Sequence, residues 1–171
     1  RKEDYDDSAW PSGKTFIGKG TARQKYKMAT TIEMGPRTFY FRKSFDFDQP
    51  AAGGELQLQY LVDDGAVFYL NGKEIHRVNM KDRGSIRYTT RALSSVRDAE
   101  LSGPIQLSGK DLKQGKNVFA VEVHQYSTND SDLAFGASLG ATVESLPDGI
   151  ILNELMAANR GSVKNGDTNP D

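Results

Sequence analysis

The stretch Val62 to Val78, VDDGAVFYLNGKEIHRV, decides the fold of this chain. Alternating apolar residues lead into Asn71-Gly72, the dipeptide that best fits a two-residue type I′ turn because both central residues need a positive φ. The polar residues Lys73 and Glu74 then lead out of the turn. Alternation on both sides of such a dipeptide predicts a β-hairpin.

The same period of two recurs on both sides of the hairpin, and almost no helical period is found. Residues 38–47 place four phenylalanines on one face. In residues 55–63, Leu56, Leu58, Tyr60 and Val62 lie on one face, with the polar Gln57 and Gln59 on the other. Further strands are predicted over 117–125 and 133–139. Short strands separated by polar turns predict an all-β protein, an antiparallel β-sandwich of the jelly-roll type.

Length and composition set outer bounds on this fold. The 171 residues suffice for one ordinary domain and a remainder, and the absence of cysteine excludes disulfides and thiolate metal sites. No apolar run approaches the roughly 18 to 20 residues that cross a bilayer. The composition shifts at the turn-like LPDG of 146–149. We therefore expect a sandwich domain over 1–145, then a linker and a second segment over 146–171.

A set of short motifs runs through residues 8–143: Trp10, FIGKG at 16–20, FYFRK at 39–43, DDGAV at 63–67, YLNG at 69–72, VEVHQ at 121–125 and SDL at 131–133. Their order resembles the galactose-binding-like jelly-roll domains of secreted, multidomain bacterial proteins. The tail from Ile151, ILNELMAANRGSVKNGDTNPD, is similar to the truncated start of a bacterial lamin-tail domain. The superfamily includes sugar-binding modules, accessory domains of phosphoesterases and glycosidases, and domains without a known ligand, so the fold alone does not assign a function.

Charge is unevenly distributed along the chain. Between Lys73 and Arg97 there are seven Lys and Arg residues against two acids, a formal charge of +5 in a chain of net charge −1. Most of this segment follows the hairpin as a long irregular connection, and arginine suits bidentate contacts with sulfate or carboxylate groups. The residues predicted to bind a ligand are Arg77, Lys81, Arg83, Arg87, Tyr88, Arg91 and Tyr126. The alternative is a solvated basic loop that pairs with acids elsewhere on the surface.

Catalytic chemistry finds little support in the sequence. The two histidines, His76 and His124, would have to converge to bind a metal, and His124 is expected to form a surface hydrogen bond with Glu122 on the same strand face. The two glycines of FIGKG, residues 16–20, predict a tight bend and not a phosphate cradle. The paired acids Asp63 and Asp64 are expected to mark a strand end. We therefore expect no enzymatic activity.

The resemblance also implies a calcium site, because jelly rolls of this kind often carry a structural calcium ion. Its candidate ligands are Asp130 and Asp132 in the loop STNDSD, with Asp4, Asp6 and Asp7 near the start of the chain as further carboxylates. The alternative is a set of solvated loop acids.

Nucleic acid and membrane surfaces are not expected as partners, since the pI is about 6.2 and no basic helix is present. The sequence instead predicts a noncatalytic carbohydrate-binding module of a secreted or cell-surface bacterial protein. It would bind an acidic or sulfated polysaccharide and target an attached enzyme in a neighbouring domain. The alternative is a structural or interaction spacer with no glycan ligand.

Overall fold

The computed structural model describes residues 1–19, 26–49 and 54–142. These ranges form strands and no helix: β1 (Ile17–Lys19), β2 (Thr30–Thr31), β3 (Thr38–Phe47), β4 (Glu55–Asp63), β5 (Gly65–Leu70), β6 (Lys73–Val78), β7 (Ser102–Ser108), β8 (Gly115–His124) and β9 (Leu133–Thr142). A helix able to cross a membrane is accordingly not found in them. The predicted linker and the lamin-tail-like segment, 146–171, lie outside the described residues.

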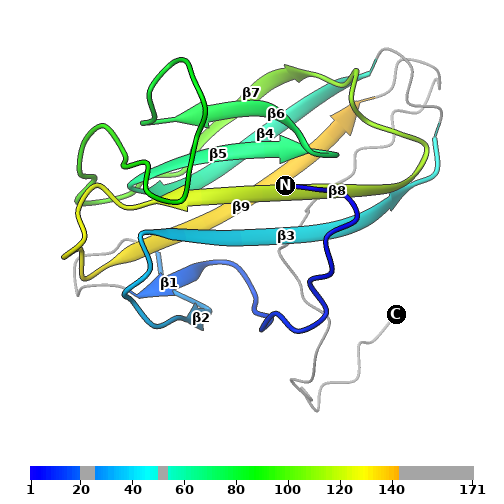
Figure 1. The fold of residues 1–171 in the computed structure, drawn as a ribbon. Helices are drawn as coiled ribbons and strands as arrows, with labels where there is room; N and C mark the ends of the chain where they lie inside the picture. Colours follow the sequence, from blue (N-terminus) through cyan, green and yellow to red (C-terminus); the bar gives the residue numbers. More distant parts are fainter. Residues whose placement is uncertain (20–25, 50–53, 143–171) are drawn as a thin grey trace.

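The strands form two sheets that pack face to face, as Figure 1 shows. One sheet has the order β2-β1-β9-β4-β7 and the other the order β3-β8-β5-β6. Every pairing is antiparallel except that of β1 with β2. The predicted all-β antiparallel sandwich is therefore confirmed.

The hairpin lies where the sequence predicts it. Asn71 and Gly72 join β5 to β6 with φ angles of 50° and 79°, which a type I′ turn requires. The register pairs Leu70 with Lys73 across the turn. The predicted bend at 16–20 is wrong over Ile17–Lys19, because this segment is β1 and pairs with β9.

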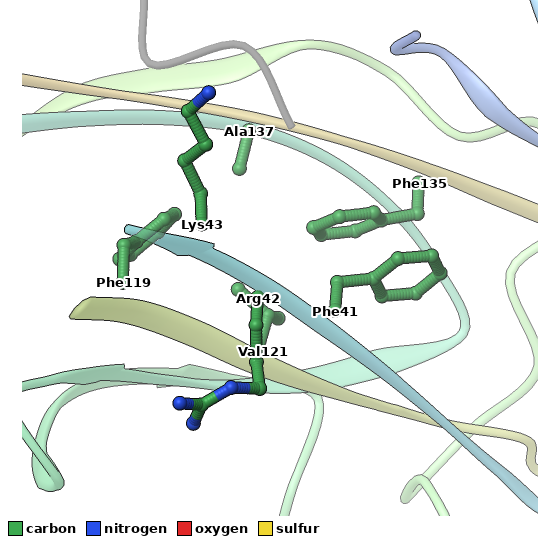
Figure 2. Close-up of a pocket in the computed structure, with 7 residues that line it drawn as sticks. All are labelled: Phe41, Arg42, Lys43, Phe119, Val121, Phe135 and Ala137. Atoms are coloured by element: carbon green, nitrogen blue, oxygen red, sulfur yellow. The ribbon is translucent and has the colours of Figure 1, made fainter. Parts of the chain in front are cut away.

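The core lies between the sheets. On the inner faces of β3 and β4 lie the alternating side chains that the sequence predicts, among them Phe47, Leu56, Leu58, Tyr60 and Val62. Phe41 of β3 stacks on Phe135 of β9, with ring centroids 4.2 Å apart. Figure 2 shows these rings beside a small cavity, lined by Phe41, Arg42, Lys43, Phe119, Val121, Phe135 and Ala137. This contact joins the two sheets through an aromatic pair.

A long loop, residues 79–101, covers the outer face of the β3-β8-β5-β6 sheet. Its Met80, Ile86 and Ala92 are buried against Val67, Tyr69 and Ala120 of the sheet. At Gly65, a Cβ would lie 2.8 Å from the Asn79 carbonyl oxygen, so this position requires glycine. The loop is therefore part of the packed structure.

Candidate functional site

The basic loop that the sequence singles out is anchored at several points. The amide of Asn79 donates to the Asp64 carbonyl at 3.1 Å, and the Thr38 hydroxyl donates to the Tyr88 carbonyl at 2.7 Å. The Ala92 N–H donates to the Gln125 carbonyl at 3.3 Å. These bonds tie the loop to the ends of β3, β4 and β8, so its side chains are displayed from a fixed backbone.

Four of the predicted basic residues are exposed on this loop: Lys81, Arg83, Arg87 and Arg91. Among the described residues, no ion pair involves any of these four side chains. Arg77 differs from them, because it forms an ion pair with Glu74 and donates to the Lys81 carbonyl. The structure thus gathers four available cations on one loop and gives Arg77 partners of its own.

The two predicted tyrosines, Tyr88 and Tyr126, lie in different places, and Tyr40 is a further exposed ring near Tyr88. Tyr88 is 49% exposed on the basic loop, and its hydroxyl accepts from the Arg37 N–H at 3.4 Å. Tyr40 of β3 is 41% exposed, and its pKa is raised by burial, with smaller contributions from Glu122 and from nearby Tyr88. Tyr126, 44% exposed, follows β8 and donates its N–H to Asp64 Oδ2. Tyr88 therefore shares its loop with the arginines and also has a second exposed ring nearby.

Glu122 and His124 form a buried pair. Glu122 is 2% exposed and His124 is fully buried, with His124 Nε2 at 3.3 Å from Glu122 Oε2. The expected surface hydrogen bond is therefore buried, because the basic loop covers this end of β8. Burial raises the pKa of Glu122, but hydrogen bonds with His124 and Arg1 outweigh burial and hold this pKa below its usual value.

Sequence reasoning missed the third member of this group. The Arg1 guanidinium donates through Nε to Glu122 Oε1 and through Nη2 to the Ile86 carbonyl, the latter at 2.6 Å. Only the pair of polar residues at alternate positions of a buried strand could have signalled a need for a counter-charge. No pattern in the sequence identifies Arg1 as its source.

Asp63 is the last residue of β4 and Asp64 joins β4 to β5, so the paired acids lie at a strand end as expected. Asp64 accepts from the N–H groups of Val96 and Tyr126 at 2.7 and 2.8 Å, and so joins two loops. Asp63 is 2% exposed, and its Oδ2 has no hydrogen-bond partner. Burial, with a hydrogen bond to Asp64, raises the pKa of Asp63 to about 8.

The loop that carries Asp130 and Asp132 approaches these acids, since their charges contribute to the raised pKa of Asp63. Asp130 Oδ2 accepts from the Ser127 N–H at 2.6 Å, while Asp7 is paired with Arg42. Oxygen donors are what calcium prefers. However, in ranges 1–19, 26–49 and 54–142 no group of three or more His, Cys, Asp or Glu side chains could hold a metal ion. Calcium therefore stays a prediction.

The two histidines lie on opposite faces of their sheet. His76 of β6 packs on the inner side against Tyr60 and Phe68, with ring centroids 5.6 and 5.8 Å away, and burial lowers its pKa. His124 lies on the outer side of β8, beside Glu122. A site that needs both rings is therefore not formed.

Comparison of the chain with protein-family models, with curated proteins and with solved structures gives no match.

Proposed function

We propose that this domain is a noncatalytic carbohydrate-binding module that takes an acidic or sulfated polysaccharide on its basic loop, residues 79–101. It would belong to a secreted or cell-surface protein and hold an attached enzyme near its substrate. One observation carries the proposal: four exposed cations without an ion pair among the described residues are displayed by a loop whose backbone is fixed.

A fixed loop reduces the entropy that binding costs, because the backbone is already ordered. Arg83, Arg87 and Arg91 can each present two parallel N–H groups to a sulfate or carboxylate, which a lysine cannot do. The exposed rings of Tyr88 and Tyr40 offer flat apolar surface against which a sugar ring can stack. Charge contacts and stacking would then act on the same side of the sandwich.

The test is affinity gel electrophoresis against neutral, uronate-rich and sulfated polysaccharides at low and at physiological salt. We expect selective retardation by an anionic glycan that persists at physiological salt. The triple variant Arg83→Ala, Arg87→Ala, Arg91→Ala should weaken this binding by roughly tenfold or more. Tyr88→Ala should weaken it without changing its dependence on salt, because this substitution removes no charge.

The matched control removes three exposed lysines outside the loop, Lys14, Lys110 and Lys116, each replaced by alanine. It lowers the net charge by the same amount as the arginine variant. Equal losses in the two variants would show attraction by net charge and would refute the site. No retardation of the unchanged protein by any glycan would support the spacer alternative.

Calcium binding is tested by thermal unfolding in calcium chloride and in excess EGTA. We expect calcium to raise Tm, since a ligand that binds only the folded state stabilises it, and we expect Asp132→Asn to remove the rise. An equal Tm in both solutions would leave Asp130 and Asp132 as ordinary loop acids.

A further inference from the structure

The guanidinium of Arg1 lies in a set of contacts on the outer face of the β3-β8-β5-β6 sheet. Nε donates to Glu122 Oε1, Nη2 donates to the Ile86 carbonyl at 2.6 Å, and Cζ lies 5.3 Å from the centroid of the Tyr69 ring. The Glu122 side chain is 3% exposed and that of Arg1 is 44% exposed. An exposed residue thus sends its charged group to a buried carboxylate.

The receiving groups are held in place by the sheet itself. Glu122 lies on β8 directly opposite Val67 of β5 and Tyr40 of β3, with Tyr69 one step further along the same face. His124 Nε2 contacts the other carboxylate oxygen of Glu122 at 3.3 Å. Glu122 therefore has a second polar partner besides Arg1.

The histidine behind the carboxylate is fixed in turn. Nδ1 of His124 lies 2.9 Å from the Thr90 carbonyl and 2.9 Å from the Thr38 hydroxyl. The Thr90 carbonyl belongs to the loop that also supplies the Ile86 carbonyl. The acceptors that face Arg1 are thus anchored from both β3 and the loop.

The chemistry of these groups selects a guanidinium. A buried carboxylate is costly unless a cation and hydrogen bonds compensate it. A planar guanidinium donates in several fixed directions and lies over an aromatic ring, so it can serve the Glu122 carboxylate, the Ile86 carbonyl and the Tyr69 ring together. An ammonium group is a compact point charge and cannot reproduce this arrangement.

We propose that Glu122, Tyr69 and the Ile86 carbonyl form a guanidinium-binding site. The Arg1 side chain occupies this site in the folded protein, and an external guanidinium cation binds there when that side chain is removed. The site adjoins the proposed glycan surface, because Ile86 belongs to the basic loop and Tyr40 lies opposite Glu122, but its occupation by a guanidinium does not require a glycan. It fastens the start of the chain both to β8 and to the loop, through Ile86.

A second arginine holds the segment from Lys2 to Asp7 in place when the Arg1 side chain is removed. Arg42 of β3 forms an ion pair with Asp7 at 2.9 Å and donates to the Lys2 carbonyl at 2.8 Å. Its guanidinium also lies 5.6 Å from the Tyr5 ring centroid. Figure 1 shows this segment running from above β8 past β3. Replacing Arg1 therefore empties one site without removing the contacts of the following residues.

The test is rescue of Arg1→Ala by small cations, followed by thermal unfolding of the whole chain. We expect Arg1→Ala to lower Tm by about 3 to 8 °C. Ethylguanidinium, at concentrations below those that denature, should restore part of this loss with saturable dependence on its concentration. Butylammonium should restore less, because it carries the charge without the planar donors.

The control variant is Lys2→Ala, which removes one positive charge from the adjacent exposed residue; its Tm should not respond to ethylguanidinium. The double variant Arg1→Ala, Glu122→Gln should lose the rescue. Arg1→Lys keeps the charge. This variant should fold, with a Tm between those of the unchanged protein and Arg1→Ala. The proposal is overturned if ethylguanidinium raises the Tm of Arg1→Ala no more than butylammonium does, or acts equally on the double variant.

Discussion

At the scale of single residues, loss of the contact between Arg1 and Glu122 should change the titration of the Glu122 carboxyl group. Its pKa lies below the usual value, so its charged form stabilises the fold above the unfolded pKa, and this stabilisation is lost as the pH falls through the lowered folded pKa. In Arg1→Ala we expect the Glu122 titration midpoint to rise, because the carboxylate loses a hydrogen bond and a nearby positive charge.

This midpoint can be followed by NMR of the Glu122 side-chain carboxyl carbon. Lys2→Ala serves again as the control and should leave the midpoint in place. A midpoint that is the same in the unchanged protein and in Arg1→Ala would show that Arg1 does not contact the carboxylate in solution.

The pKa of Asp63 is shifted in the opposite direction to that of Glu122. Its pKa is about 8 in the folded protein and near its ordinary value of 3.8 in the unfolded chain. The folded state therefore holds a proton that the unfolded chain releases, and stability falls as the pH rises from about 4 to 8. We expect Asp63→Asn to abolish this fall and to be more stable than the unchanged protein at pH 9, by an amount on the order of a few kcal/mol.

Urea denaturation in excess EGTA from pH 5 to pH 9 measures this difference. Asp98→Asn, at an exposed position of the loop, is the control and should keep the slope of the unchanged protein. Parallel pH profiles for Asp63→Asn and the unchanged protein would contradict the assignment of a protonated Asp63.

Sequence patterns could not reveal that Glu122 is buried. Period-two alternation places Glu122 and His124 on the outer face of a strand, and outer faces of sandwiches usually meet water. Here Met80, Ile86 and Ala92 bring a loop over that face. Burial of an outer face depends on the path of a distant segment, which alternation within one strand does not encode.

At the scale of elements, the strongest patterns gave the strands correctly. Alternation predicted the strands at 38–47 and 55–63 with the bounds that the structure shows, and the Asn71-Gly72 turn joins β5 to β6. Besides β1, which was predicted as a bend, the prediction lacked β2 and β7. These two strands have little alternation of their own: β2 has two residues, and β7 contains Gly103 and Pro104. Their pairing depends on neighbouring strands.

Asn71 shows how much a turn residue can add to its element. Besides its positive φ, its Oδ1 accepts from the Val118 N–H at 2.9 Å and its Nδ2 donates to Asn117 Oδ1 and to the Asp111 carbonyl at 2.8 Å. Glycine permits the same φ but supplies none of these bonds. We expect Asn71→Gly to lower the free energy of unfolding by roughly 2 to 4 kcal/mol, since buried partners lose their hydrogen bonds.

The measurement is chemical denaturation, with Gly72→Asn as the companion variant. Gly72 also has a positive φ that asparagine tolerates, and its position is exposed, so this change should cost much less. Equal costs would show that the turn geometry, and not the side chain of Asn71, stabilises this end of the sheet.

At the scale of the whole molecule, stability depends on the contact between the sheets. Phe135 is 1% exposed and stacks on Phe41 across the core, beside the cavity in Figure 2. We expect Phe135→Ala to cost about 3 to 5 kcal/mol, because it removes buried apolar surface and enlarges a space that is already imperfectly filled. Tyr126→Ala, at an exposed ring, should cost far less in the same denaturation experiment.

The sequence predicted the sandwich more fully than it predicted the candidate sites. Clustered charge located the basic loop, whose exposed side chains include Lys81, Arg83 and Arg87. It could not show that Arg77 pairs with Glu74, since both lie in β6 and a register shift in the pairing of β5 with β6 interrupts the alternation between them. The Arg1 contact joins residues 121 positions apart, and no periodic pattern reaches that far.

The place of β3 at the outer side of its sheet bears on the solubility of this protein. An outer strand exposes backbone donors and acceptors that can recruit a strand from another molecule, and β3 is ten residues long and rich in phenylalanine. Arg42, at the middle of this strand, is paired with Asp7, and Lys43 follows it. Charged side chains on an outer strand disfavour the addition of a second strand, so we expect a neutral residue at position 43 to increase association along this edge.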